Sequence, residues 1–191
     1  MKPKEIFASH VYADSSLDLD QNYLTQLKAS IELMRRGDIN GNTASNWDFG
    51  WQSDMLPHSG PFEELTKKIT EKAFAFCKNL KNFNFSRVEI TALWANINYK
   101  GDINWPHNHQ GDLAGVFYLY THNNSGNLIL DSFNYNQNCK IGCYLSDKEK
   151  IIITPKKNQI ILFDSSCMHY VTKNHSDDIR ISMSFNIKVH D

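Results

Sequence analysis

The chain has 191 residues, a formal net charge of −1 and 12% aromatic residues. It contains no long basic run, so the sequence does not favour a nucleic-acid partner. The first residues lack the apolar core of a signal peptide, and no stretch approaches the length of a membrane span. The four cysteines form no CxxC pair, which fits a reducing cytoplasm. We therefore expect one soluble cytoplasmic domain. Its oligomeric state is left open, a homodimer included.

Two amphipathic segments predict helices in the first part of the chain. In residues 20–36, apolar residues recur at helical spacing before Gly37. In residues 61–80, Pro61 suits the first helical turn and a second apolar stripe follows. The apolar positions are Leu24, Leu27, Ile31 and Met34 in the first segment, and Phe62, Leu65, Ile69, Ala73, Phe76 and Leu80 in the second. We expect both helices to cover a core, with an ordered loop at 37–54 between them.

From Ser86 onward the pattern changes to short runs rich in β-branched and aromatic residues, separated by turn-forming residues. The runs are 87–99, 113–120, 126–132, 140–145, 150–154, 158–164 and 180–189. They predict a mainly β fold: a double-stranded β-helix (jelly-roll, or cupin-like barrel) with the N-terminal helices packed on the outside. We expect a single domain over 1–191, with a helical N-terminal layer in 1–85 and the jelly-roll core in 86–191.

A His-x-His pair stands out in the segment "GDINWPHNH". Side chains two positions apart on an extended segment point to the same face, so His107 and His109 face a barrel mouth together or face away from it together. Iron and zinc need a further ligand, and His169, which follows the apolar run 158–164, is the candidate. Such pairs also arise by chance, and most histidines are surface or hydrogen-bonded residues. The remaining histidines lack this context and are interpreted as surface residues: His10, His58, His122, His175 and His190.

Arg180 begins the last strand-like run, and its alternation with Ser182 and Ser184 directs three polar side chains to one face. The opposite face is apolar and predicts core: Ile179, Ile181, Met183 and Phe185. An arginine beside a hydroxyl can hold a carboxylate through a two-pronged hydrogen bond. The ordinary alternative is a solvated charge at the rim of the sheet. A metal cluster and a carboxylate clamp predicted on the same strands favour a binding site.

The order of these elements resembles that of the 2-oxoglutarate- and Fe(II)-dependent dioxygenases. It is most similar to a branch of small oxygenases of bacteria and phages, with the prolyl 4-hydroxylases as more distant relatives. The shared features are a glycine six positions before the first histidine (Gly101), the His-x-His pair, the "FYL" run (117–119), the distal histidine (His169) and the following arginine (Arg180). The resemblance covers about residues 94–188, and the ordered set carries it, because no single element is specific.

This resemblance implies an oxidoreductase, a hydroxylase that uses Fe(II), 2-oxoglutarate and O2. The residues implied as metal ligands are His107, His109 and His169. Those implied to hold the distal carboxylate of 2-oxoglutarate are Arg180, Ser182 and Tyr118. The histidines and Arg180 are thereby implied as catalytic residues. The reaction would couple the conversion of 2-oxoglutarate to succinate to the oxidation of a C–H bond. The substrate is not identified by the sequence and is a small molecule or a protein side chain.

Three positions depart from the family pattern or leave a choice. The second metal ligand of the superfamily is usually a carboxylate, whereas this chain has His109; Asp112 or a water molecule are the alternatives. Asn104 replaces an aromatic residue of the prolyl hydroxylases, which puts cosubstrate contacts from that position in doubt. Tyr118 is either a cosubstrate ligand or a core tyrosine with a satisfied hydroxyl group.

Other functions also fit parts of the sequence. A cupin-type metal-binding protein, or a three-histidine dioxygenase independent of 2-oxoglutarate, fits the histidines but leaves the arginine–serine pair unexplained. A thiol hydrolase using Cys167 and His169 lacks an evident orienting group, and Cys139 and Cys143 form only half a zinc site. The roles of these three cysteines stay open. The residues that we expect near a pocket mouth are Trp94, Asn96, Asn98, Trp105 and the loop 46–51.

Overall fold

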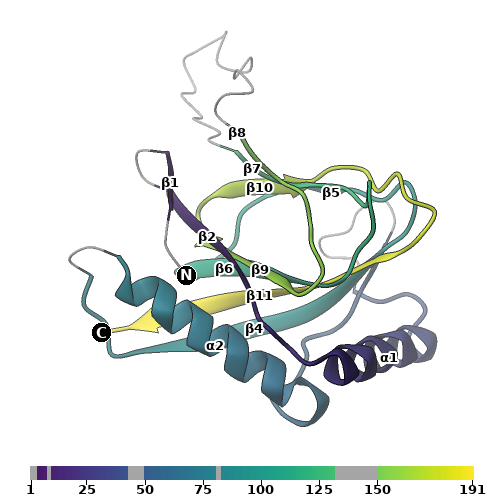
Figure 1. The fold of residues 1–191 in the computed structure, drawn as a ribbon, viewed down its shortest axis with the longest axis horizontal. Helices are drawn as coiled ribbons and strands as arrows, with labels where there is room; N and C mark the ends of the chain where they lie inside the picture. Colours follow the sequence, from purple (N-terminus) through teal and green to yellow (C-terminus); the bar gives the residue numbers. More distant parts are fainter. Residues whose placement is uncertain (1–3, 8–9, 43–49, 81–82, 132–149) are drawn as a thin grey trace, which may run out of the picture.

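Two antiparallel sheets face each other in a jelly-roll, and two helices cover the larger sheet (Figure 1). The computed structural model describes residues 4–7, 10–42, 50–80, 83–131 and 150–191. The order of the large sheet is β1 (Lys4–Phe7), β2 (His10–Ser16), β9 (Gln159–Asp164), β6 (Leu113–Tyr120), β11 (Arg180–His190), β4 (Arg87–Asn98) and β3 (Trp51–Gln52). The order of the small sheet is β5 (Asn104–His107), β10 (Met168–Val171), β7 (Leu128–Asp131) and β8 (Lys150–Ile153). This architecture confirms the predicted fold class.

The two helices are α1 (Gln21–Gly37) and α2 (Glu63–Lys78), the latter preceded by the short 3-10 helix η1 (Gly60–Phe62). Asp20 caps α1, because its carboxylate accepts hydrogen bonds from the backbone N–H groups of Asn22 and Tyr23. The apolar stripes of both helices pack into one core with β4, β6, β9 and β11, as predicted. Neither helix in the described part of the chain is both long and apolar enough to cross a membrane.

The predicted runs account for most strands after residue 86, whereas the N-terminal strands and two short strands of the small sheet were not predicted. Six of the seven predicted runs form strands, and the seventh, 140–145, lies outside the described residues. The strands without a sequence prediction are β1, β2, β3, β5 and β10. Residues 1–85 thus contribute three strands to the large sheet as well as two helices, so the N-terminal layer is not purely helical.

Strand β11 separates two cores. Its apolar residues, Ile181, Met183 and Phe185, are fully buried against the helices. The residues between them point to the other side, where Arg180, Ser182 and Ser184 line a pocket between the two sheets. The predicted alternation is therefore present, and the polar face of β11 is an inner wall of the barrel. This strand pairs with β4 on one side and β6 on the other, which places the pocket at the centre of the large sheet.

Replacing Gly115 of β6 with alanine should destabilise the fold strongly. A Cβ atom at this position would lie 2.5 Å from the ring of Phe185 and 2.6 Å from the carbonyl oxygen of Ile161, which belongs to the backbone of β9 and cannot rotate away. We expect a loss of about 2–3 kcal/mol in the free energy of unfolding, measured by urea denaturation. Gly37→Ala is the control, since nothing lies within 4 Å of its added Cβ. Equal stability of the two variants would contradict this packing.

Candidate metal centre

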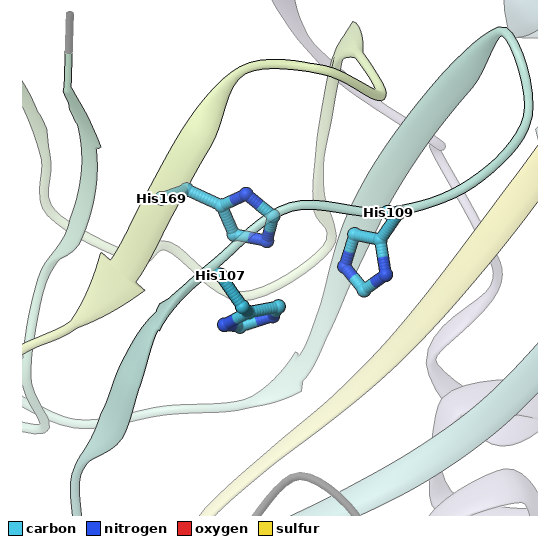
Figure 2. Close-up of side chains that lie close together, drawn as sticks. All are labelled: His107, His109 and His169. Atoms are coloured by element: carbon cyan, nitrogen blue, oxygen red, sulfur yellow. The ribbon is translucent and has the colours of Figure 1, made fainter. Parts of the chain in front are cut away.

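The three histidines of the sequence prediction meet in the structure. His107 ends β5 and His169 lies in β10, and the two are directly opposite each other in the antiparallel pairing of these strands. Their ring centroids are 4.3 Å apart. His109 lies in the loop after β5, where its backbone N–H donates a hydrogen bond to the carbonyl oxygen of Ser165. Figure 2 shows the three rings pointing toward one another from β5, the following loop and β10.

Backbone carbonyl groups determine which nitrogen of two of these rings is available. The Nδ1 atom of His107 lies 2.6 Å from the carbonyl oxygen of Trp105, and that of His169 lies 2.9 Å from the carbonyl oxygen of Cys167. A carbonyl oxygen only accepts, so each Nδ1 must carry the proton. The lone pair of each neutral ring is then on Nε2, which is the usual arrangement of a metal-ligating histidine.

The potential ligand atoms of His107, His109 and His169 all lie within 4.8 Å of one another. Among the described residues, this is the group of side chains that could hold a metal ion, and it contains imidazoles alone. Imidazole nitrogen suits iron and zinc as well as copper and nickel. The donor set therefore fits a transition metal, and it does not fit magnesium or calcium, which prefer oxygen ligands.

Burial keeps two of the histidines neutral. Burial, together with the smaller effect of the nearby ring of His107, lowers the pKa of His109 to about 4 and that of His169 to about 3. A protonated ring cannot bind a metal, so depressed pKa values leave the ligand atoms free at neutral pH. Because burial disfavours the charged imidazolium, this effect comes from the barrel interior itself.

The metal-free protein should lose stability as the pH falls below about 6.5. The folded-state pKa values of His109 and His169 lie below the ordinary value of 6.5. At a pH between the folded-state pKa and 6.5, the unfolded chain therefore binds more protons than the folded one. The free energy of unfolding then decreases on acidification, by up to about 1.4 kcal/mol per pH unit for each histidine. Urea denaturation in EDTA between pH 7.5 and 5 measures this slope. His169→Gln should have a smaller slope, and equal slopes in the two proteins would contradict the prediction.

The histidines share one pocket with the predicted carboxylate clamp. Its lining includes the three rings together with Arg180, Ser182 and Tyr118. Arg180 is 2% exposed, and its guanidinium donates hydrogen bonds from Nη1 to the carbonyl oxygen of Ser125 and from Nη2 to Oδ1 of Asn98. Both acceptors are uncharged, so neither neutralises the guanidinium.

The guanidinium of Arg180 has unused binding capacity. Its Nε atom is buried and has no hydrogen-bond partner among the described residues. In the described ranges of the chain no carboxylate forms an ion pair with it, and Asp102 contributes only a longer-range attraction. Burial accordingly lowers the pKa of Arg180, and it raises the pKa of Tyr118 to about 12. A buried cation without a counter-ion is costly, so this wall of the pocket favours an anionic ligand.

The structure also locates the residues that the sequence left as alternatives. Asp112 is held elsewhere: its carboxylate accepts a hydrogen bond from the backbone N–H of Val189 and lies 3.0 Å from Nζ of Lys188. It is not among the side chains that could hold the ion. Asn104 lines the pocket. This arrangement favours His109 over Asp112 as the second ligand.

A nucleophilic role of Cys167 is not favoured. The thiol is buried, and burial raises its pKa to about 12, whereas a reactive cysteine needs a thiolate at neutral pH. The Nδ1 atom of the neighbouring His169 donates a hydrogen bond to the backbone carbonyl oxygen of Cys167. Cys139 and Cys143 lie outside the described residues.

The pocket lining agrees with part of the sequence prediction. Trp94, Asn96 and Asn98 line the pocket as expected. Trp105 is 52% exposed and is absent from the lining, so its place at the mouth stays a prediction, and Trp51 is buried in the core between helices and sheet instead of lining this pocket. Residues 46–49 lie outside the described part of the chain. Ser125, which holds Arg180, had no sequence signal, because it contributes only a backbone carbonyl group.

The protein family described as "Putative 2OG-Fe(II) oxygenase" matches residues 92–186. This match runs from within β4 into β11 and contains the three histidines and Arg180. The chain belongs to this family of 2-oxoglutarate/Fe(II) oxygenases. The family inferred from the sequence is thereby confirmed, and the oxygenase is an enzyme of this class. No curated protein matches the sequence of the oxygenase.

Solved structures share the fold of the oxygenase at low sequence identity. The collagen prolyl hydroxylase of Paramecium Bursaria Chlorella virus-1, in complex with 2-oxoglutarate, has a TM-score of 0.61 and 15% identity, covering 94% of this chain and 96% of that chain. HygX from Streptomyces hygroscopicus, with nickel, 2-oxoglutarate and hygromycin B bound, has a TM-score of 0.68 and 8% identity, covering 93% and 82%. A Trichoplax adhaerens prolyl hydroxylase in complex with a hypoxia inducible factor peptide fragment has a TM-score of 0.62 and 13% identity, covering 94% and 83%.

Proposed function

We propose that the oxygenase is a hydroxylase that binds one Fe(II) ion through His107, His109 and His169 and uses 2-oxoglutarate as cosubstrate. The observation that carries this proposal is the shared pocket: three imidazoles line the same space as a buried arginine that forms no ion pair within the described residues. In the overall reaction, 2-oxoglutarate and O2 give succinate and CO2, one oxygen atom enters succinate, and the other enters a C–H bond of the substrate. Related structures that hold 2-oxoglutarate, or nickel together with 2-oxoglutarate, support the choice of a metal ion and 2-oxoglutarate as the groups that this pocket binds.

The residues of the pocket fit both the metal and the cosubstrate. Bound iron would supply the activation of O2 and the attachment point for the keto end of 2-oxoglutarate. Arg180 would pair with the distal carboxylate, beside the hydroxyl groups of Ser182 and Tyr118, which line the same pocket. The remaining walls are partly apolar, with Leu128, Phe163 and Val171 in the lining. Such walls keep water away from the reacting groups.

The substrate is a small molecule or a protein side chain. Both kinds occur among structures that share the fold, since HygX holds hygromycin B and the Trichoplax adhaerens enzyme holds a peptide fragment. Near His109 the lining offers the indole of Trp94, whose ring centroid is 5.6 Å from that of the histidine. The amide of Asn96 lies on the same strand and donates a hydrogen bond to the hydroxyl group of Ser184. These uncharged groups are the surfaces we propose for substrate contact.

A three-histidine dioxygenase that does not use 2-oxoglutarate is the competing function. It would account for the imidazoles, but it gives no role to a guanidinium that is 2% exposed and whose Nε atom has no hydrogen-bond partner in the described part of the chain. The buried arginine therefore supports the cosubstrate-dependent reaction.

Succinate formation tests this proposal directly. Protein loaded with Fe(II) would be supplied with 2-oxoglutarate and O2, alone and with a panel of free amino acids, peptides and small metabolites. We expect slow succinate release without substrate and faster release with a compound that is hydroxylated. His107→Ala is the control and should form none. Wild-type protein that holds iron but forms no more succinate than this variant under every condition would contradict the proposed function.

A further inference from the structure

The amide side chain of Asn98 is hydrogen-bonded to the guanidinium of Arg180. Asn98 is fully buried at the end of β4 and lies directly opposite Arg180 in the pairing of β4 with β11. Its Oδ1 atom accepts a hydrogen bond of 2.8 Å from Nη2 of Arg180. The backbone carbonyl oxygen of Asn98 also accepts a hydrogen bond from Nδ2 of Asn174, which fixes the end of the strand.

The orientation of this amide follows from its neighbours. A guanidinium has donors and no acceptor, so the amide oxygen of Asn98 must face Arg180. The amide nitrogen then faces the other way, where it lies 3.5 Å from Oδ1 of Asn104. Asn104 begins β5, the strand that ends at His107. The amide thus lies between the arginine and the strand that carries a metal ligand.

The chemical identity of this residue matters because its nearest analogue is aspartate. Aspartate has the same shape and would accept the same hydrogen bond, but it would also neutralise the guanidinium. With asparagine on Nη2 and the carbonyl group of Ser125 on Nη1, two nitrogens of Arg180 are held by uncharged acceptors, and no described carboxylate forms an ion pair with it. A residue that served only the stability of the barrel would be better as aspartate, since a buried cation is stabilised by a counter-ion.

We propose that Asn98 is a positioning residue for cosubstrate binding: it holds the guanidinium of Arg180 in place and, being uncharged, leaves that charge for the distal carboxylate of 2-oxoglutarate. This inference rests on the proposed function. It assigns to Asn98 a selectivity role, because a 2-oxo acid without a second carboxylate has no group to pair with Arg180.

The variant Asn98→Asp separates this role from a structural one. A carboxylate at this position would occupy the guanidinium and repel the distal carboxylate of the ligand. We expect the affinity for 2-oxoglutarate to fall by roughly ten-fold or more, on the scale of one lost charge-assisted hydrogen bond. The melting temperature of the ligand-free protein should be unchanged or higher, because the buried cation gains a counter-ion. Asn98→Ala, which removes the acceptor without adding charge, should weaken 2-oxoglutarate binding less than Asn98→Asp.

The experiment is an anaerobic titration of Fe(II)-loaded protein with 2-oxoglutarate and, separately, with pyruvate, following the metal-to-ligand absorption band. Pyruvate has the chelating keto-acid end but lacks the second carboxylate, so its affinity should be nearly the same in wild type and Asn98→Asp. The matched control is Asn96→Asp, which adds the same charge to the same strand. Asn96 lines the pocket but hydrogen-bonds to Ser184 instead of Arg180. We expect this control to lose less affinity for 2-oxoglutarate than Asn98→Asp.

The outcomes distinguish the two proposals. If the wild type gives no band with 2-oxoglutarate, the proposed function fails and the role of Asn98 fails with it. If the wild type binds 2-oxoglutarate and Asn98→Asp binds it equally well, the inference about Asn98 alone is wrong. A parallel loss of pyruvate affinity, of iron binding or of the folded state in Asn98→Asp, or an equal loss in Asn96→Asp, would also overturn it. A loss confined to 2-oxoglutarate supports it.

Discussion

Replacing His107 or His169 with alanine should abolish stoichiometric metal binding while the chain stays folded. Each ring provides one of three donor atoms that lie within 4.8 Å of one another. Removing an outer-shell partner of a metal ligand already costs roughly 10–100-fold in affinity, so removing the ligand itself should cost more. The fold should persist, because burial of an unliganded imidazole contributes little to stability. Anaerobic titration with Fe(II), together with circular dichroism of each variant, measures both effects.

His109 is the informative position of this set. If three histidines hold the ion, His109→Ala should lose affinity as severely as the other two variants, and Asp112→Asn should retain it. The carboxylate of Asp112 is bound to Val189 and Lys188, so its amide analogue tests the alternative ligand with little change in shape. Full metal affinity in His109→Ala would rule out the three-histidine site. A loss of Fe(II) affinity in Asp112→Asn alone would show that the carboxylate of Asp112 is the second ligand. The exposed His58 provides the neutral control, His58→Ala.

The sequence pattern predicted the long strands because their periodicity is local. The strands that carry the metal ligands, β5 and β10, have four residues each and show little alternation. β5 contains Pro106, which is tolerated because this strand lies at the edge of the small sheet. Both strands depend on pairing with each other across a long stretch of chain. The formation of β5 and β10 therefore depends on tertiary contacts, which a short stretch of sequence does not reveal.

The meeting of the three histidines was predictable in part. The spacing of His107 and His109 predicted two rings on one face, and the position of His169 after an apolar run made it the candidate for the third ligand, which the family resemblance also implied. That His107 and His169 lie directly opposite each other is a matter of strand register, set by the whole barrel. The resemblance implied His109 as the second ligand, with Asp112 or water as alternatives, because the direction of a loop residue depends on what the loop contacts. The backbone hydrogen bond from His109 to Ser165 supplies that information.

The surroundings of Arg180 show a similar limit. Alternation along β11 predicted which face the arginine shares with Ser182, and that face lines the pocket. From the sequence alone, Asn98 was predicted only to lie near the pocket mouth. Its contact with the guanidinium follows from the pairing of β4 with β11, in which Asn98 and Arg180 are opposite each other. The role of a side chain that acts through another residue can be recognised once the register of the paired strands is known.

Arg180→Lys should weaken the binding of 2-oxoglutarate by roughly ten-fold or more, on the scale of losing one or two charge-assisted hydrogen bonds. The guanidinium donates hydrogen bonds to Ser125 through Nη1 and to Asn98 through Nη2, and its Nε atom has no hydrogen-bond partner in the described ranges of the chain. This arrangement presents a planar donor group in a fixed orientation. An ammonium group is a point charge with no fixed plane, and it cannot contact both acceptors and pair with two carboxylate oxygens at once. The charge is preserved in this variant, so the loss measures geometry.

The Fe(II) affinity of Arg180→Lys shows whether a loss of 2-oxoglutarate affinity comes from the arginine or from the metal site. Arg180 is not among the side chains that could hold the ion, so Fe(II) affinity should be nearly unchanged in Arg180→Lys. The control is Arg87→Lys, since Arg87 is exposed and paired with Glu89. An anaerobic titration following the metal-to-ligand band gives the affinity for 2-oxoglutarate in all three proteins. If Arg180→Lys bound the cosubstrate as tightly as wild type, the buried arginine would not be a carboxylate clamp. The histidines would then fit a dioxygenase that does not need 2-oxoglutarate. If affinity fell while iron binding stayed intact, the arginine and the metal would act on opposite ends of one ligand, as the shared pocket leads us to expect.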